Sequence, residues 1–169
     1  MKQVRQVRLD HVSVTTTDLD QSISFYRDVI GLPLVDRGDL DEGVIETLIE
    51  RRGARARWAE LALGGGQVLE LVQYLEPAED RVDQRTWRPG ATHIGLSIES
   101  IDDVLERLGE QGYHASDVVT LDEPGWEGVR CVYATDPDGV TIELVERPAE
   151  RVVVVPEAEG VGERATPSA

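Results

Sequence analysis

Glu70 lies inside an apolar stretch, VLELVQY at residues 68–74, that has the composition of a strand. A short run rich in Val and Leu is typical of a mostly buried strand, and a carboxylate is rarely buried unless a partner receives its charge. A basic side chain, a metal ion or water at a sheet edge could serve as that partner. Glu143 occupies the same place in a second stretch, TIELV at residues 141–145. The sequence therefore holds two carboxylates that need the same explanation.

Two histidines accompany these glutamates at the start of matching segments. His11 opens HVSVT and His93 opens HIGLSI, and each shares its strand face with small or polar residues, because alternate residues of a strand point to the same side. Glu143 shares its face with Thr141, whereas Glu70 lies between two valines. Large aliphatic residues lie on the opposite faces: Ile94, Leu96, Ile142 and Leu144. The four ionisable side chains are therefore expected to face one polar hollow.

Two imidazoles and two carboxylates that converge in a polar hollow form a divalent metal site. A mixed set of nitrogen and oxygen ligands leaves open positions in octahedral geometry, and zinc accepts the same ligands. We therefore predict that one divalent ion, which could be Ni, Co, Zn, Mn, Mg or Fe, binds His11, Glu70, His93 and Glu143. Such an ion would receive the charge of Glu70.

An internal repeat supplies the elements that position these residues. Residues 10–31 and residues 92–112 share the order strand, capping residue, helix and glycine, with Asp18 and Ser100 as the expected helix caps. This pattern predicts one strand followed by one helix at the start of each half of the chain.

The second half of each repeat is expected to form a hairpin. Residues 64–72 and residues 136–145 share a tight glycine turn that leads into a strand. Residues 56–63 and residues 129–136 have strand composition and supply the partner strands. The repeating unit is therefore βαβββ.

These elements predict an α+β fold in which two tandem βαβββ modules form a curved mixed-sheet cup around the metal site. The first module is expected at residues 7–75, a linker at residues 76–89 and the second module at residues 90–147. Residues 148–169 are rich in Pro, Gly, Ala and Glu and are predicted to be disordered. The valine run at residues 152–155 could instead add an edge strand or cover a partner subunit.

Length and composition favour a single domain that acts on small molecules. A chain of 169 residues can bury a core without disulfides. Its 17 Lys and Arg against 33 Asp and Glu give a formal charge of −16, which repels nucleic acid and anionic lipid. No apolar run is long enough to span a membrane, and the lone Cys131 with no apolar signal sequence near Met1 predicts a cytoplasmic protein. The basic cluster at residues 51–57 could contact an anionic substrate arm or form a solvated surface.

The paired modules, the DPDG turn at residues 136–139 and the order His, Glu, His, Glu resemble the vicinal oxygen chelate superfamily. That superfamily includes glyoxalase I, methylmalonyl-CoA epimerase, extradiol dioxygenases and fosfomycin or bleomycin resistance proteins. The resemblance covers about residues 7–147. It implies that the four residues bind the metal, that substrate oxygens take the open positions, and that Glu143 or Glu70 acts as the base that shuttles a proton.

Differences between this sequence and particular family members narrow the range of expected substrates. Glyoxalase I carries an Arg four residues after its first ligand and an Asn four residues after its second, and both hold glutathione. This chain has Thr15 and Tyr74 there, which disfavours glutathione. Methylmalonyl-CoA epimerase usually has Gln at the position of Glu70, and it carries a catalytic Glu in a segment similar to residues 43–49. Glu46 is therefore a candidate second base, and a surface position on a short helix is the alternative.

The resemblance implies a metal-dependent isomerase or epimerase-like lyase that abstracts a proton next to a carbonyl of a small polar substrate. A sugar-like ketone, a hydroxyketone or an acyl thioester fits this chemistry, and epimerisation of a cyclitol ketone in secondary metabolism is favoured. Family members often dimerise, so we expect a homodimer if the cup is incomplete within one chain.

Two other functions stay open. An iron(II) extradiol dioxygenase uses two His and one carboxylate, so a fourth ligand at Glu70 would crowd its site, and only His114, expected at the surface, could supply the extra acid–base His. A drug-binding resistance protein without catalysis usually lacks the four ligands and has aromatic pocket walls. This chain is poor in aromatic residues, although Trp126 in residues 122–129 could lie in a lid.

Overall fold

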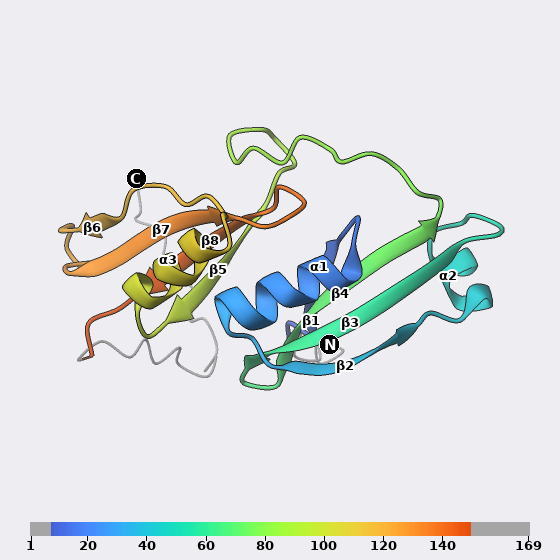
Figure 1. Ribbon diagram of the computed structural model, residues 1–169, viewed down its shortest axis with the longest axis horizontal. Coiled ribbons are helices and arrows are strands. Elements are labelled where there is room, and N and C mark those ends of the chain that lie inside the picture. The colour runs from blue at the N-terminus through green and yellow to red at the C-terminus, as the bar shows by residue number, and fades with distance from the viewer. Residues whose placement is uncertain (1–7, 150–169) are drawn as a thin grey trace, which may run out of the picture.

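The computed structural model describes residues 8–149, which form two four-stranded mixed sheets with helices packed against them (Figure 1). The first sheet contains β1 (His11–Thr15), β2 (Leu34–Asp39), β3 (Arg55–Gly64) and β4 (Gln67–Glu76), in the order β1-β4-β3-β2. The second contains β5 (His93–Ile98), β6 (Val119–Leu121), β7 (Val129–Thr135) and β8 (Thr141–Glu146), in the order β5-β8-β7-β6. The first strand of each sheet pairs in parallel with the last strand, and the other pairs are antiparallel. The predicted α+β fold of two tandem βαβββ modules is confirmed.

Residues 77–92 connect β4 to β5 without a helix or strand. The valine run at residues 152–155 and the rest of the tail from residue 150 lie outside the described residues, as do residues 1–7.

Capping residues begin the two main helices as the sequence predicts. The Asp18 side chain accepts from two backbone N–H groups at the start of α1 (Leu19–Ser24), and Ser100 caps α3 (Ile101–Glu110) through the Asp103 N–H. A further helix, α2 (Glu42–Leu48), lies between β2 and β3. Among residues 8–149, no helix is long and apolar enough to cross a membrane.

The helix expected to end at Gly31 changes type along its length. After α1 the chain continues as a π-helical segment, η1 (Phe25–Ile30), in which the Gly31 N–H donates to the Tyr26 carbonyl five residues earlier. The neighbouring aromatic residues Phe25 and Tyr26 are both fully buried, and the wider turn accompanies their joint burial. Gly31 then ends the helix with a φ of 99°, a conformation that favours glycine.

One hydrophobic core joins the two modules. It contains the inner strand residues Val14 and Leu71 of the first sheet and Leu96 and Leu144 of the second. The helical segments of the two modules contact one another, because the Arg107 guanidinium on α3 donates to the Val29 carbonyl on η1 at 2.7 Å. Since the apolar strand faces lie in this core, the polar faces of both sheets are left toward the outside.

A polar contact at the turn between β7 and β8 fastens the second module to the first. The Asp138 carboxylate accepts from the Thr16 hydroxyl at 2.5 Å and from the N–H and hydroxyl of Thr17 at 3.0 and 2.6 Å. Arg81 of the linker lies 3.1 Å from the same carboxylate. Burial works against the charge of Asp138, but these bonds outweigh it and hold the pKa of this carboxyl below its usual value.

The other acid of this turn, Asp136, is buried and organises the turn from within. It accepts from the backbone N–H groups of Asp138 and Val140 at 2.9 and 2.7 Å, and the Tyr26 hydroxyl donates to it at 2.9 Å. Burial raises the pKa of Asp136 above its usual value. The DPDG turn is therefore a structural junction between the modules as well as a hairpin.

Candidate functional site

The first module brings His11 and Glu70 together on one sheet face. In the parallel pairing of β1 with β4, Ser13 lies opposite Glu70, and the alternation along β1 puts His11 on the same side as Ser13. The distance from His11 Nε2 to Glu70 Oε2 is 3.9 Å. The sequence prediction that these two residues share a face is borne out.

Asp10 orients His11 within this pair. His11 Nδ1 lies 2.9 Å from Asp10 Oδ1, which leaves Nε2 on the side of Glu70. That hydrogen bond is the main cause that raises the pKa of His11, and the charges of Glu70 and Glu60 add to it. Metal-binding histidines commonly pair their second ring nitrogen with a carboxylate in this way.

The second module repeats the arrangement with a shorter distance. Gly95 on β5 lies opposite Glu143 on β8, so His93 occupies the position that His11 has in the first module. His93 Nε2 lies 3.2 Å from Glu143 Oε2. Gly95 has no side chain, and a Cβ added there would make an ordinary van der Waals contact with the Glu143 carboxylate, at 3.7 Å.

The four predicted ligands thus form two pairs, one on each sheet. Within residues 8–149 of a single chain, no group of three or more His, Cys, Asp or Glu residues is placed to hold a metal ion. The side chains of His11, Glu70, His93 and Glu143 are 47%, 25%, 42% and 27% exposed, so each pair is open to another molecule. Each pair offers one imidazole nitrogen and one carboxylate, which fits half of the donor set of a divalent metal.

Two residues beside these pairs were missed by the sequence analysis. On the neighbouring strands, Glu60 lies opposite Glu70 and Tyr133 lies opposite Glu143, so each shares a face with its module's pair. Burial and the charge of Glu143 raise the pKa of Tyr133, and its ring lies 5.6 Å from that of His93. Both residues could have been predicted from the sequence, because the pairing of each hairpin, followed from its turn, gives the residue that lies opposite the glutamate.

The other candidate residues from the sequence analysis are Glu46, His114 and Trp126. Glu46 lies on the short helix α2, is partly buried, and accepts from the Gly53 N–H, which holds the loop after the helix. Its role as a second base stays a prediction. His114 is exposed, and Trp126, 47% exposed in the loop between β6 and β7, is covered on one face by the Arg147 guanidinium at 5.0 Å.

Comparison with known proteins gives consistent results over most of the chain. The family model described as the Glyoxalase/Bleomycin resistance protein/Dioxygenase superfamily matches residues 8–144. A 2-epi-5-epi-valiolone epimerase from Actinomyces sp. is 32% identical over 85% of this chain and 81% of its own length. A probable lactoylglutathione lyase from Synechocystis sp. is 26% identical over 83% of this chain and 96% of its own length. Both of these relatives bear the names of enzymes.

A solved structure supports the fold at similar coverage. A glyoxalase family protein from Bacillus cereus matches with a TM-score of 0.72 at 26% identity, over 86% of this chain and 97% of that one.

Proposed function

The chain belongs to the Glyoxalase/Bleomycin resistance protein/Dioxygenase superfamily, and from this premise we propose that it is a metal-dependent isomerase or epimerase-like lyase that abstracts a proton next to a carbonyl of a small polar substrate. The observation that carries the proposal is the repeated register that sets an imidazole beside a carboxylate on the outer face of each sheet. The relative named as an epimerase of 2-epi-5-epi-valiolone supports the choice of epimerisation. A cyclitol or sugar-like ketone is the substrate class that we favour.

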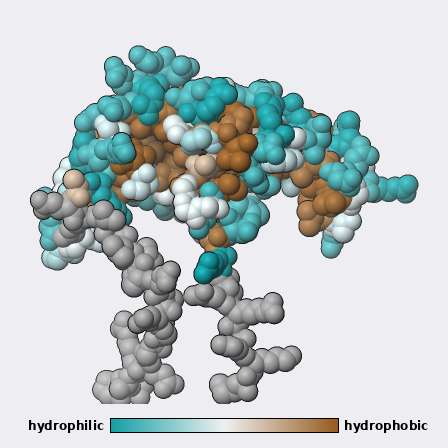
Figure 2. All heavy atoms as spheres, turned by 90° about the horizontal axis from the view of Figure 1, so that it is seen from below, coloured by the Kyte–Doolittle hydropathy of each residue, from teal (hydrophilic) through white to brown (hydrophobic). Residues whose placement is uncertain are grey.

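The metal site would be completed by two copies of the chain. Each copy has two sheets (Figure 1) and carries one pair on each of them, and the side chains of each pair are partly exposed. If the first module of one copy faces the second module of another, the four ligands meet and a homodimer holds two such sites. Figure 2 shows apolar side chains at the surface between hydrophilic ones on the side of the molecule seen from below.

The ligand residues also supply the acid–base chemistry. A divalent cation held by His11, Glu70, His93 and Glu143 would polarise the substrate carbonyl and stabilise the negative charge that grows on its oxygen as the neighbouring C–H loses its proton. In an isomerisation, Glu143 or Glu70 would take that proton and return it to the neighbouring carbon. Epimerisation needs proton transfer on both faces of a planar carbon, and Glu46 is the candidate for the second face.

The placement of Glu70 bears on the rival dioxygenase. That chemistry needs two histidines and one carboxylate with three open positions, whereas Glu70 lies on the same face as His11 and would add a fourth ligand to the proposed site. This geometry favours proton transfer over oxygen activation. Activity with iron(II) alone, and its loss in air, would support the dioxygenase instead.

The first test is elemental analysis of the purified protein, followed by hydrogen–deuterium exchange into cyclitol ketones, hydroxyketones and acyl thioesters. We expect one metal ion per chain and exchange that stops on chelation and returns when the metal is restored. Absence of metal with no exchange after any addition would overturn the proposed function.

A mixing experiment tests the two-copy site. His11→Ala and His93→Ala should each empty the site when expressed alone. In a co-expressed mixed dimer, the intact first module of the His93→Ala chain faces the intact second module of the His11→Ala chain, so one of the two sites is whole. His114→Ala is the matched control, because His114 is exposed outside both pairs. If the mixed dimer bound no more metal than either variant alone, assembly of the site from two copies would be refuted.

A further inference from the structure

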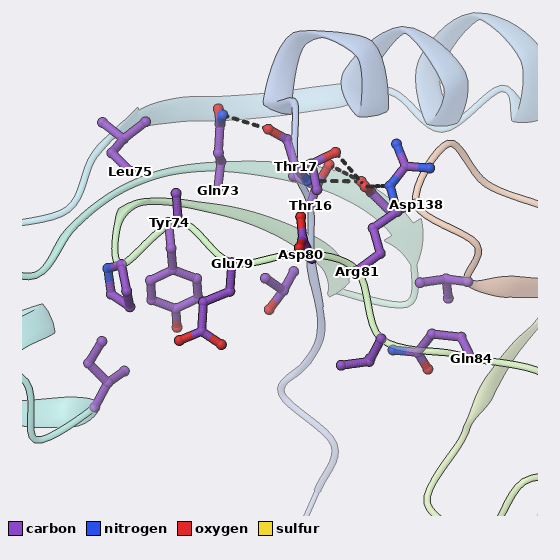
Figure 3. A pocket seen from close by; sticks show the side chains of 16 residues that line it. Thr16, Thr17, Gln73, Tyr74, Leu75, Glu79, Asp80, Arg81, Gln84 and Asp138 are labelled. Carbon is purple, nitrogen blue, oxygen red and sulfur yellow. Dashed lines mark hydrogen bonds and ion pairs between the residues drawn. The ribbon is translucent and has the colours of Figure 1, made fainter.

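A cavity of about 510 Å³ lies at the ends of β1 and β4, the strands that carry the His11–Glu70 pair, and Figure 3 shows the side chains that line it. Its walls come from the ends of β1 and β4, from the linker at residues 77–84 and from the turn between β7 and β8. This volume is in the range of small-molecule sites. Because the linker and the DPDG turn are fastened to each other through Arg81 and Asp138, the cavity is formed within one chain.

The cavity continues the strand faces that carry the first pair. Thr15 lies four residues after His11 on β1, and Tyr74 lies four residues after Glu70 on β4, so both point to the same side as the pair. Four residues of extended chain cover about 13 Å at roughly 3.3 Å per residue. A single-ring ketone whose carbonyl lies at the pair is shorter than this, so only a substrate that carries a further arm or a second ring would also fill the cavity.

Three polar side chains in the cavity wall have hydrogen-bonding capacity to spare. The Thr15 hydroxyl, the Tyr74 hydroxyl and the Gln84 amide line the cavity, and none of them makes a side-chain hydrogen bond to another of the described residues. Apolar side chains stand beside them, among them Ile49 and Val82. Hydroxyls and an amide within an apolar wall suit a ligand part that carries hydroxyl groups.

The charge of the cavity wall is negative. Glu79 and Asp80 both line it, and the guanidinium of Arg81, its single lining cation among residues 8–149, is already bound to Asp138 at 3.1 Å. In Figure 3, the Glu79 carboxylate extends to the same side of the cavity as the Tyr74 ring. Glu79 also lies 3.9 Å from Arg51, but both groups are exposed, and such a pair contributes little. An anionic ligand would meet two carboxylates and no unpaired cation.

We propose that this cavity binds a distal part of the substrate that bears hydroxyl groups and is uncharged or positively charged, and that it rejects anionic arms. The assignment rests on the proposed function only in placing the reacting carbonyl at the metal-binding pairs. Binding in the cavity itself needs no metal, because none of the four ligand residues lines it.

The test uses three sugars that share one ring and differ in charge: glucosamine, glucose and glucose 6-phosphate. Their affinities are measured by ligand-observed NMR with the metal-free, full-length protein at low ionic strength, where charge effects are largest. We expect glucosamine and glucose to bind, and glucose 6-phosphate to bind at least about tenfold more weakly than glucosamine. Comparable or tighter binding of the phosphate, or no binding of any sugar at tens of millimolar, would overturn the inference.

Variants test whether the cavity is responsible for the difference in affinity between glucosamine and glucose 6-phosphate. Glu79→Gln with Asp80→Asn should bring the affinities of glucosamine and glucose 6-phosphate together, while Tyr74→Phe should weaken all three sugars several-fold. Glu106→Gln with Glu110→Gln is the matched control, because it removes the same charge from exposed positions of α3. A control pair that abolishes the discrimination equally would show that net charge, and not the cavity, selects the ligand.

The two proposals fail in different ways. A protein that discriminates the sugars but shows no metal-dependent proton exchange keeps the cavity site and loses the proposed reaction. A protein with metal-dependent exchange that binds all three sugars equally loses the cavity assignment alone.

Discussion

The two modules have the same order of strands and helix and the same alignment of the glutamate with the histidine, but the residues next to the two His–Glu pairs differ. In each module the glutamate lies opposite the residue two positions after the histidine. The neighbours differ: Asp10 precedes His11 where Thr92 precedes His93, and Glu60 stands where the second module has Tyr133. The repeat therefore retains the positions of the donor atoms, while the flanking residues give each pair its own electrostatic environment.

The hairpin turns show the same contrast. The turn of the first module is built from Gly64, Gly65 and Gly66, each with positive φ, and offers no side chain to the rest of the protein. The turn of the second module carries Asp136 and Asp138, which bind residues of the first module. The first turn only reverses the chain, whereas the second also holds the modules together.

The largest effect is expected from removing one glutamate of either pair. Glu70→Ala and Glu143→Ala should each weaken metal affinity by about tenfold to a hundredfold or more, because each removes one of four ligands. Titration calorimetry with the metal-free protein measures both. Equal losses would establish the pairs as equivalent halves of one site, and an unchanged affinity in either variant would remove that residue from it.

The next largest effect should appear at the junction turn. Asp138→Ala removes the acceptor of the Thr17 N–H and hydroxyl and one of the acceptors of the Thr16 hydroxyl, and should lower the free energy of unfolding by about 2 kcal/mol. For a chain of this size, that corresponds to a fall in Tm of roughly 4–8 °C. Gln67→Ala, next to the glycine turn of the first module, is the control and should change Tm little. Equal shifts in the two variants would contradict the contrast between the turns.

Lowering the pH should reduce the contribution of Asp138 to the free energy of unfolding. Its pKa is lowered in the folded protein, so its contribution is present above the ordinary value of 3.8 and is lost as the pH falls below it. Asp136 has the opposite shift, caused first by burial and in part by the charge of Asp138. Asp138→Asn therefore also relieves part of the Asp136 shift, which makes the gap at neutral pH somewhat smaller than Asp138 alone would give. Urea unfolding should show a large gap between wild type and Asp138→Asn at about pH 6 and a smaller one at about pH 3. A gap that does not shrink would refute this account.

The smallest effect concerns the environment of the first pair. Asp10→Asn should lower the pKa of His11, and Glu60→Gln should lower it less, because the hydrogen bond from Asp10 is the main cause of its elevation. NMR titration of the imidazole in the metal-free protein follows both variants. Glu106→Gln serves as the control for net charge. A larger change with Glu60→Gln than with Asp10→Asn would reverse the ranking.

Much of the fold and half of the site geometry could be predicted from local patterns. Alternation along HVSVT and HIGLSI assigned each histidine to the strand face opposite its large aliphatic neighbours, and the caps at Asp18 and Ser100 predicted where the helices begin. The π-helical segment could not be predicted, because it depends on how Phe25 and Tyr26 pack in the shared core. The junction role of the DPDG turn was also missed, since its partners lie more than a hundred residues earlier in the chain.

The sequence by itself determined which four residues are the candidate ligands and which face of each strand they occupy, because strand periodicity is a local property of the chain. Only the tertiary structure decided that the four donors divide into two pairs on separate sheets and that a negatively charged cavity lies beyond one of them. Periodicity gives the direction of a side chain relative to its own sheet. The position of one sheet relative to another follows instead from the packing of helices and turns in the shared core, which no local pattern encodes.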